Sequence, residues 1–133
     1  MTRKNGFTLS IVLPAGAEKI YKAWLSSDGH TSMTSSPAKV TGKVGGKFTA
    51  WDGYISGKTL ELEKPHRILQ AWRTSEFPEG ASDSLVEILL SEVKGGTRIT
   101  LKHYDMPPDQ VNSYKQGWED FYFKPMRKYF EKH

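Results

Sequence analysis

Near the C-terminal end of the chain, apolar residues recur every three or four positions, the pattern of a helix with one apolar side. That side would carry Val111, Tyr114, Trp118, Phe121, Tyr122, Met126, Tyr129 and Phe130. The pattern predicts a helix from residue 108 to about residue 131. We expect a kink near Lys124, because Pro125 removes a backbone hydrogen bond inside the helix. So broad an apolar side needs a large partner surface.

Alternating apolar and polar residues predict strands over most of the chain before this helix. The expected strands cover residues 7–13, 40–44, 47–51, 54–63, 67–73, 85–92 and 97–104. After the first strand we expect two short helices, one over residues 15–25 and one ending near Met33. The prediction is an α+β fold in which a curved antiparallel sheet of six to seven strands wraps on the long C-terminal helix. We expect a single domain over residues 1–133.

Two glycine-containing pairs mark turns between these strands. Gly45-Gly46 is expected to enter a strand with a positive φ angle, which glycine adopts without strain. Asp52-Gly53 is typical of a two-residue type I′ hairpin turn. Neither pair is a phosphate-binding loop, because such a loop opens into the N-terminus of a helix.

Four short motifs follow one another along the chain. They are Gly45-Gly46-Lys47-Phe48, Asp52-Gly53-Tyr54-Ile55-Ser56-Gly57, Trp72-Arg73 with Phe77-Pro78-Glu79-Gly80, and Gln116-Gly117-Trp118 followed by Phe121-Tyr122-Phe123. In this order and spacing they resemble the C-terminal domain of the activator of the ninety-kilodalton heat-shock chaperone ATPase. The order of elements is similar to the helix-grip fold of the START and plant-allergen (SRPBCC) superfamily. The resemblance covers nearly the whole chain and implies that fold, a chaperone as one candidate partner, and a role in the stress response.

The eukaryotic activator has a separate N-terminal domain that makes much of the contact with the chaperone. A chain of 133 residues has no room for that domain. We therefore expect at most weak stimulation of a chaperone ATPase.

Composition excludes several kinds of site and partner. The chain has no cysteine, which excludes disulfides and thiolate metal sites and fits a reducing compartment. Its net charge is +4, yet the basic residues are mixed with fifteen acids and form no stripe, so nucleic acid is not an expected partner. No apolar run reaches the ~20 residues of a membrane helix, and the start of the chain does not resemble a signal peptide. We expect a cytoplasmic protein without a membrane span.

His103 is the ionisable residue of most interest, because strand alternation places it on the side of Ile99 and Leu101. It is a candidate general base or hydrogen-bond donor in an apolar pocket. The alternative is a histidine at a strand end whose nitrogens are satisfied by backbone or water. No spacing of His, Asp and Glu resembles a metal site, and no serine lies in a strand-to-helix elbow. We expect no metal, no cofactor and no catalytic residue.

A cavity between the sheet and the C-terminal helix is the expected site. The residues expected to line it and to bind a ligand are Trp24, Trp51, Tyr54, Trp72, His103, Trp118 and Tyr122. We expect a non-catalytic protein that holds an apolar or amphipathic small molecule, such as a lipid-like ligand. Whether the cavity is open or filled by its own aromatic rings stays undecided, and two alternatives remain. One is a module that docks a chaperone, and the other is an enzyme of the cyclase or hydratase type that uses His103 with Tyr54 or Tyr122 as acid and base.

Overall fold

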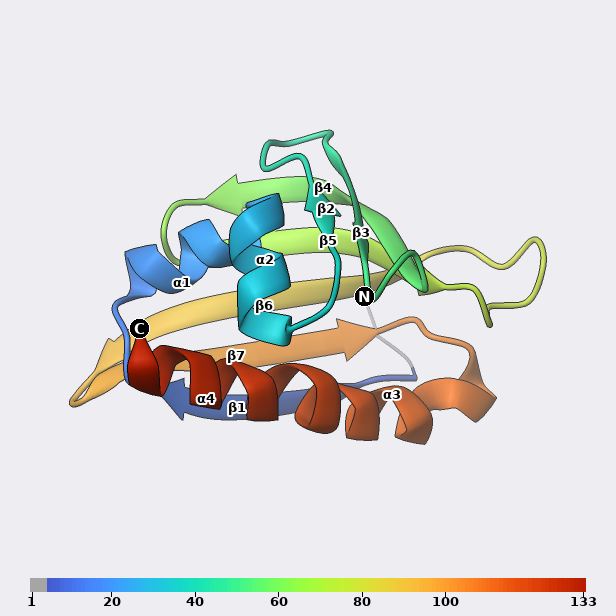
Figure 1. The fold of residues 1–133 in the computed structure, drawn as a ribbon. Coiled ribbons are helices and arrows are strands. Elements are labelled where there is room, and N and C mark those ends of the chain that lie inside the picture. Colours follow the sequence, from blue (N-terminus) through green and yellow to red (C-terminus); the bar gives the residue numbers. More distant parts are fainter. Residues whose placement is uncertain (1–4) are drawn as a thin grey trace.

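A computed structural model describes residues 5–133 of the chain. Seven strands and several helical segments follow one another along it (Figure 1). Their bounds are β1 Phe7–Leu13, α1 Ala17–Trp24, α2 Ser27–Thr34, β2 Lys39–Val40, β3 Lys47–Ala50, β4 Ile55–Glu63, β5 Arg67–Thr74, β6 Ser84–Val93 and β7 Gly96–Tyr104, then a 3₁₀ turn Pro108–Gln110, α3 Val111–Trp118, a π-helical segment Glu119–Phe123 and α4 Lys124–Lys132.

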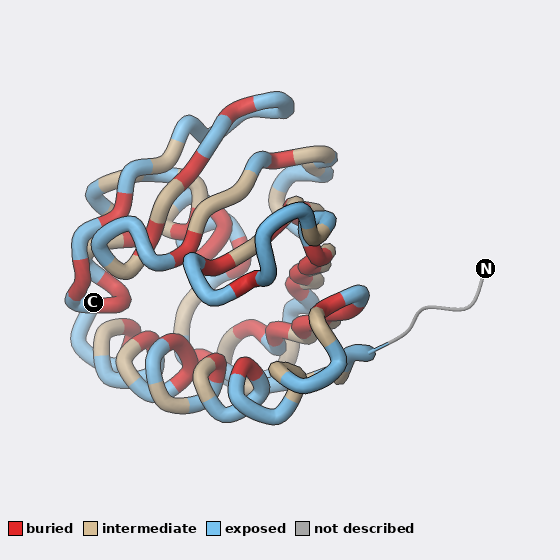
Figure 2. Tube along the Cα trace, turned by 90° about the vertical axis from the view of Figure 1, so that its right-hand side faces the viewer, coloured by how far each residue is buried: buried red, intermediate tan, exposed pale blue. Residues whose placement is uncertain are grey.

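The strands form one antiparallel sheet in the order β1-β7-β6-β5-β4-β3-β2. All helices lie on one side of it, where α1 contacts β6 while α4 contacts both β1 and α2 (Figure 1). The buried positions of the sheet and of the C-terminal helix face each other (Figure 2). This arrangement of layers is the one that the sequence pattern predicts.

Alternation along the three central strands builds the inner face of the sheet. Side chains at Ile68, Gln70 and Trp72 on β5 are buried, and so are their counterparts on β6 and β7. His103 belongs to this inner set and is fully buried. A β-bulge between Thr59 and Glu61 interrupts the pairing of β4 with β5, and bulges bend and twist a strand.

On the outer face, Arg67 lies at the centre of a carboxylate cluster. Its guanidinium group contacts Glu61 and Glu87 at 2.7 Å each and Glu63 at 3.0 Å. These hydrogen bonds raise the pKa of Arg67. Glu87 therefore lies outside the core, as its alternation indicates, but it is covered by an ion pair rather than open to water.

One predicted strand and one predicted turn need correction. The strand expected over residues 40–44 is only Lys39–Val40, because the chain turns at residues 43–46 and the Gly45 N–H bonds to the Thr59 carbonyl at 2.8 Å. Gly45 has the expected positive φ of 83°. The β3–β4 hairpin also exists, but Ala50 pairs with Ile55, so its loop has four residues, 51–54, rather than two.

The interruption expected near Lys124 is the π-helical segment, in which the Lys124 N–H bonds to the Glu119 carbonyl five residues back. Pro125 has no N–H, and its ring would clash with the carbonyl four residues before it in a regular helix. A π turn holds one residue more than an α turn, so it rotates the turns that follow by about 100°. This rotation brings Met126 and Phe130 to the side of Tyr114 and Trp118, and all four are buried.

Candidate ligand-binding site

A hollow of about 370 Å³ lies between the sheet, the β3–β4 loop and α3. We call it the aromatic cavity, and its lining is Trp51, Tyr54, Ile55, Trp72, Tyr114, Gly117, Trp118, Phe121 and Tyr122. The sheet supplies Trp72 because β5 alternates, and the helix supplies Tyr114, Gly117, Trp118 and Phe121 because these positions repeat every three or four residues. The cavity is therefore not filled by its own side chains, although most of its wall is aromatic.

Gly117 leaves part of this space free. A Cβ atom built on it would meet only the Phe121 ring, at 3.9 Å, which is an ordinary van der Waals distance. Larger residues are therefore sterically allowed at position 117, and they would fill the cavity from the helix side.

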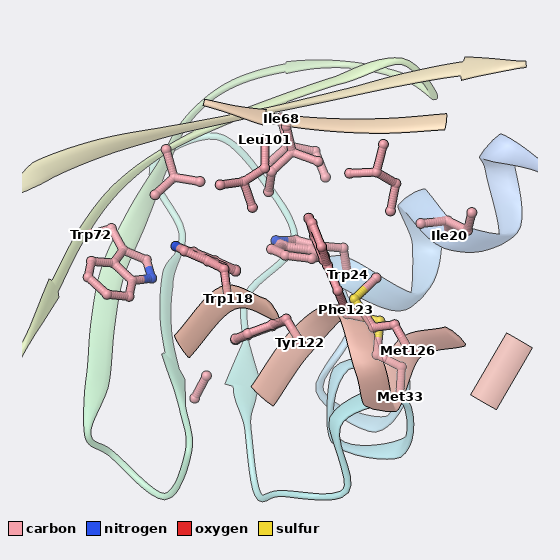
Figure 3. Packing of buried hydrophobic residues seen from close by; sticks show 14 of the residues in the cluster. Ile20, Trp24, Met33, Ile68, Trp72, Leu101, Trp118, Tyr122, Phe123 and Met126 are labelled. Carbon is pink, nitrogen blue, oxygen red and sulfur yellow. The ribbon is translucent and has the colours of Figure 1, made fainter. Parts of the chain in front are cut away.

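Trp118 occupies the centre of the aromatic wall. Its ring centroid lies 4.5 Å from that of Tyr122, 5.9 Å from that of Trp72 and 6.1 Å from that of Trp24. Figure 3 shows the rings of Trp72, Trp118 and Trp24 in a row between the sheet and the helix. Trp72 and Trp118 line the cavity, whereas Trp24 lies behind them.

His103 holds Trp118 from the sheet side. The indole N–H of Trp118 donates to Nδ1 of His103 at 2.9 Å. Nε2 of His103 lies 2.8 Å from Oγ of Ser84, which itself donates to the Trp72 carbonyl at 2.7 Å. Since the single Ser84 proton goes to that carbonyl, His103 carries its proton on Nε2 and donates it to Ser84.

This histidine is neutral. Burial lowers the pKa of His103 to about 3, and the indole N–H requires an acceptor at Nδ1. Neither nitrogen has a free lone pair or proton to offer a substrate. The site thus lacks the general base that the enzyme alternative placed at position 103.

A second buried histidine, His30, holds Tyr122. Its Nδ1 lies 2.9 Å from the Trp24 carbonyl, which can only accept, so Nε2 accepts from the Tyr122 hydroxyl at 2.8 Å. Burial lowers the pKa of His30 and raises that of Tyr122. The sequence analysis did not single out His30. The available signal is its spacing of three residues from Met33, which places both on one side of the second short helix, and the structure shows that this side is buried.

Trp24 is fixed by a polar pair inside the core. Its indole N–H donates to Oε1 of Gln70 at 3.3 Å, and Nε2 of Gln70 donates to Oγ1 of Thr59 at 3.2 Å. This network uses the polar atom of Trp24, and the ring supports Trp118 and Tyr122 from behind.

The tyrosine hydroxyls around the cavity are also engaged. Tyr114 donates to Oε1 of Gln110 at 2.5 Å and accepts from Oγ1 of Thr74 at 2.6 Å. Tyr54 donates to the carboxylate of Glu76. Burial is the main cause that raises the pKa of both phenols, so they stay neutral. The cavity wall thus offers ring faces and edges rather than acids or bases.

Trp51 and Phe121 form the mouth of the cavity. Their rings meet edge to face at 5.3 Å, and Phe121 is 55% exposed, unlike the rest of the helix lining. Trp51 has a left-handed backbone with φ of 52°, and its indole N–H is buried without a hydrogen-bond partner among the described residues. Backbone conformations of this kind are frequent at functional sites, and a buried donor without a partner calls for an explanation such as a bound water or ligand.

The structure brings five of the seven expected residues into the lining. Trp24 and His103 lie behind it, because the Trp118 ring separates them from the open space and their polar atoms bond within the core. The analysis of the sequence missed Ile55, Tyr114, Gly117 and Phe121 as lining residues. Tyr114 and Phe121 belonged to the apolar helix pattern, and Ile55 and Gly117 to the family motifs, so a signal was present for each. That these residues bind a ligand stays a prediction.

Over residues 5–133, no group of three or more His, Asp or Glu side chains is arranged to hold a metal ion. Within the same range, no helix has the length and apolar character needed to cross a membrane.

Comparison with known proteins places the chain in a family named after an activator of a chaperone ATPase. A family model described as "Activator of Hsp90 ATPase homolog 1-like protein" matches residues 14–131. The human activator of 90 kDa heat shock protein ATPase homolog 1 is 25% identical over 123 residues, which are 92% of this chain and 36% of the relative. Mouse homolog 2 is 27% identical over 110 residues, which are 83% of this chain and 33% of the relative. The chain thus spans about a third of the length of these relatives.

Solved structures agree with the fold. The crystal structure of an HSP90 activator from Plasmodium falciparum superposes with a TM-score of 0.80 at 26% identity, over 90% of this chain and 91% of that one. The solution structure of the Aha1 dimer from Colwellia psychrerythraea gives a TM-score of 0.79 at 19% identity, over 95% and 96% of the two chains, which shows a shared fold alone. The resemblance and the helix-grip fold predicted from the sequence are confirmed.

Proposed function

This chain belongs to the family of Activator of Hsp90 ATPase homolog 1-like proteins, and within that family we propose that it binds an apolar or amphipathic small molecule between its sheet and its C-terminal helix. The observation that carries the proposal is the aromatic cavity of about 370 Å³. This volume falls in the range of small-molecule sites, which are concave and mostly apolar.

The cavity wall supports binding rather than catalysis. Each tyrosine hydroxyl in it has a protein partner, and His103 is neutral and separated from the space by Trp118. Recognition would therefore rest on shape and on contact with ring faces, which favour flat aromatic or aliphatic bodies. The same arrangement argues against a cyclase or hydratase that uses His103.

Native mass spectrometry of freshly purified protein tests whether a small molecule is retained. A thermal-shift screen of fatty acids, sterols and aromatic polyketides extends the test, since a ligand that binds only the folded state raises the melting temperature. We expect Gly117→Leu to abolish that rise, because the new side chain fills the cavity. Lys115→Leu is the matched control, since it places the same side chain at an exposed position two residues earlier.

Two results would remove the binding proposal. One is a screen with no stabiliser and no retained mass. The other is stabilisation of equal size in Gly117→Leu and in the unchanged protein, which would place the ligand elsewhere.

A regulatory contact with an Hsp90-type chaperone is the second candidate function. The observation that favours it is the Plasmodium falciparum protein, described as an HSP90 activator, of which this chain covers 91%. We expect weak stimulation of the chaperone ATPase in a purified assay, because this chain matches only about a third of the longer activators. Strong stimulation at stoichiometric protein would make docking the main function, whereas no stimulation and no binding would eliminate it. A cytoplasmic location suits both roles and remains part of the proposal.

A further inference from the structure

A second hollow adjoins the aromatic cavity and shares Trp51 with it. We call it the basic hollow. Its lining is Ser32, Thr34, Ser35, Trp51, Asp120, Lys124, Pro125, Lys128, Tyr129 and Lys132, and its volume is about 530 Å³. The two hollows follow the same helix, with the aromatic cavity along its first half and the basic hollow along its second half.

Three lysines give the basic hollow a positive charge. Lys124, Lys128 and Lys132 are spaced by four residues and therefore lie on one side of α4. Asp120 accepts from Lys124 at 2.9 Å. Lys128 and Lys132 form no ion pair with any described residue, so two positive charges remain for a ligand.

Trp51 lines both hollows, and its indole N–H is a hydrogen-bond donor. Its N–H has no partner among residues 5–133 and is shielded from water. A buried unpaired donor is costly, and a ligand acceptor that the N–H reaches through a small shift of the Trp51 ring would recover that cost.

The spacing along the helix fits one elongated ligand. From Phe121 at the mouth of the aromatic cavity to Lys124 and Lys128, the helix rises about 5 to 10 Å. An apolar body held in the cavity would thus bring a polar group at its end within reach of the lysines.

From these observations we infer that the ligand is an anionic amphiphile. Its apolar body fills the aromatic cavity, and its carboxylate, sulfonate or phosphate end lies at Lys128 and Lys132 with the Trp51 N–H beside it. This inference rests on the proposed binding function and adds the chemical class of the ligand.

A matched pair of fluorescent probes separates the charge from the apolar body. 1-Anilinonaphthalene-8-sulfonate carries a sulfonate, and N-phenyl-1-naphthylamine has the same rings without it. We expect the sulfonate probe to bind more tightly, with an affinity that falls as salt is added, whereas the neutral probe should respond little to salt.

Three variants locate the charge contact. Lys128→Gln combined with Lys132→Gln should weaken the sulfonate probe by about 2- to 30-fold, the scale of two exposed charge contacts, and leave the neutral probe within about twofold. Trp51→Phe should lower the affinity ratio of the sulfonate probe to the neutral probe by about 3- to 10-fold, because it removes the N–H and keeps an aromatic ring. Lys115→Gln removes an exposed lysine of the same helix outside both hollows and should change neither probe.

The outcomes separate the two proposals. If the neutral probe binds and Gly117→Leu displaces it, but the lysine variants leave the sulfonate probe unchanged, the anionic class is wrong and the binding function stands. If neither probe binds, the binding function itself fails. If Gly117→Leu leaves the sulfonate probe bound, that probe sits on surface lysines outside the cavity, and the inference is overturned.

Discussion

Trp118→Phe should destabilise the fold mainly by removing one hydrogen bond. Phe keeps most of the buried ring area but cannot donate to Nδ1 of His103, which lies in a site with no exposure to water. A buried acceptor left unpaired costs about 1–3 kcal/mol. The loss of ring volume adds to this, so Trp118→Ala should reach about 3–5 kcal/mol.

Trp51→Phe is the matched control for this change. It is the same chemical substitution at an indole whose N–H has no partner among the described residues. We expect it to cost under about 1 kcal/mol, since no hydrogen bond is broken. The difference between the two variants therefore contains the bond from Trp118 to His103, together with the greater loss of packed ring volume at the more deeply buried position 118.

Urea denaturation followed by far-UV circular dichroism measures both free energies of unfolding, and it avoids a fluorescence signal that the substitutions themselves would alter. Equal losses for Trp118→Phe and Trp51→Phe would refute the role given to His103. A loss under about 1 kcal/mol for Trp118→Ala would show that the aromatic wall is exposed rather than packed.

Three further predictions concern stability. The pKa of His103 falls from its ordinary value of 6.5 to about 3 in the folded chain, so between these pH values the unfolded chain binds more protons than the folded chain. The stability that His103 contributes should therefore be full above pH 6.5 and fall by on the order of 4 kcal/mol towards pH 3. Denaturation across this pH range checks it, and His103→Gln should lose less unfolding free energy than the unchanged protein. Tyr122→Phe leaves Nε2 of buried His30 unpaired and should cost about 1–3 kcal/mol, whereas Tyr129→Phe removes a hydroxyl with no hydrogen bond to a described residue and should change the unfolding free energy by under about 0.5 kcal/mol. Gly117→Ala should raise the unfolding free energy by up to about 1 kcal/mol, since alanine favours the helix and its methyl group enters free space; a destabilised variant would contradict the open cavity.

The sheet was predictable because its signal is local. Alternation with a period of two decides the face of each residue on β5, β6 and β7, so Ile99, Leu101 and His103 were assigned to one side correctly. Loop lengths were less predictable. Trp51 takes a left-handed backbone that alternation does not reveal, and this extends the expected two-residue turn to four residues.

The lining of the cavity depends on depth, which alternation does not encode. Trp72 and His103 both face inward from the sheet, yet only Trp72 reaches the open space. The Trp118 ring lies between the cavity and Trp24, and its N–H binds His103 from the same position. The sequence could therefore predict which residues share the interior, but the packing of one helix residue decided which of them can touch a ligand.

Pro125 connects the local sequence signal to this site. The proline predicted an interruption, and the apolar side predicted from the sequence included Phe121 and Tyr129 together with Met126 and Phe130. The π-helical segment rotates the turns that follow it, and Met126 and Phe130 are buried there as predicted, whereas Tyr129 is only partly buried. Phe121 lies within the segment and is exposed at the cavity mouth, so its assignment to the buried side was wrong. The same rotation sets the direction of Lys124, Lys128 and Lys132, which line the second hollow beside Trp51. A residue that costs helix stability thus places the aromatic and basic parts of the proposed site next to each other.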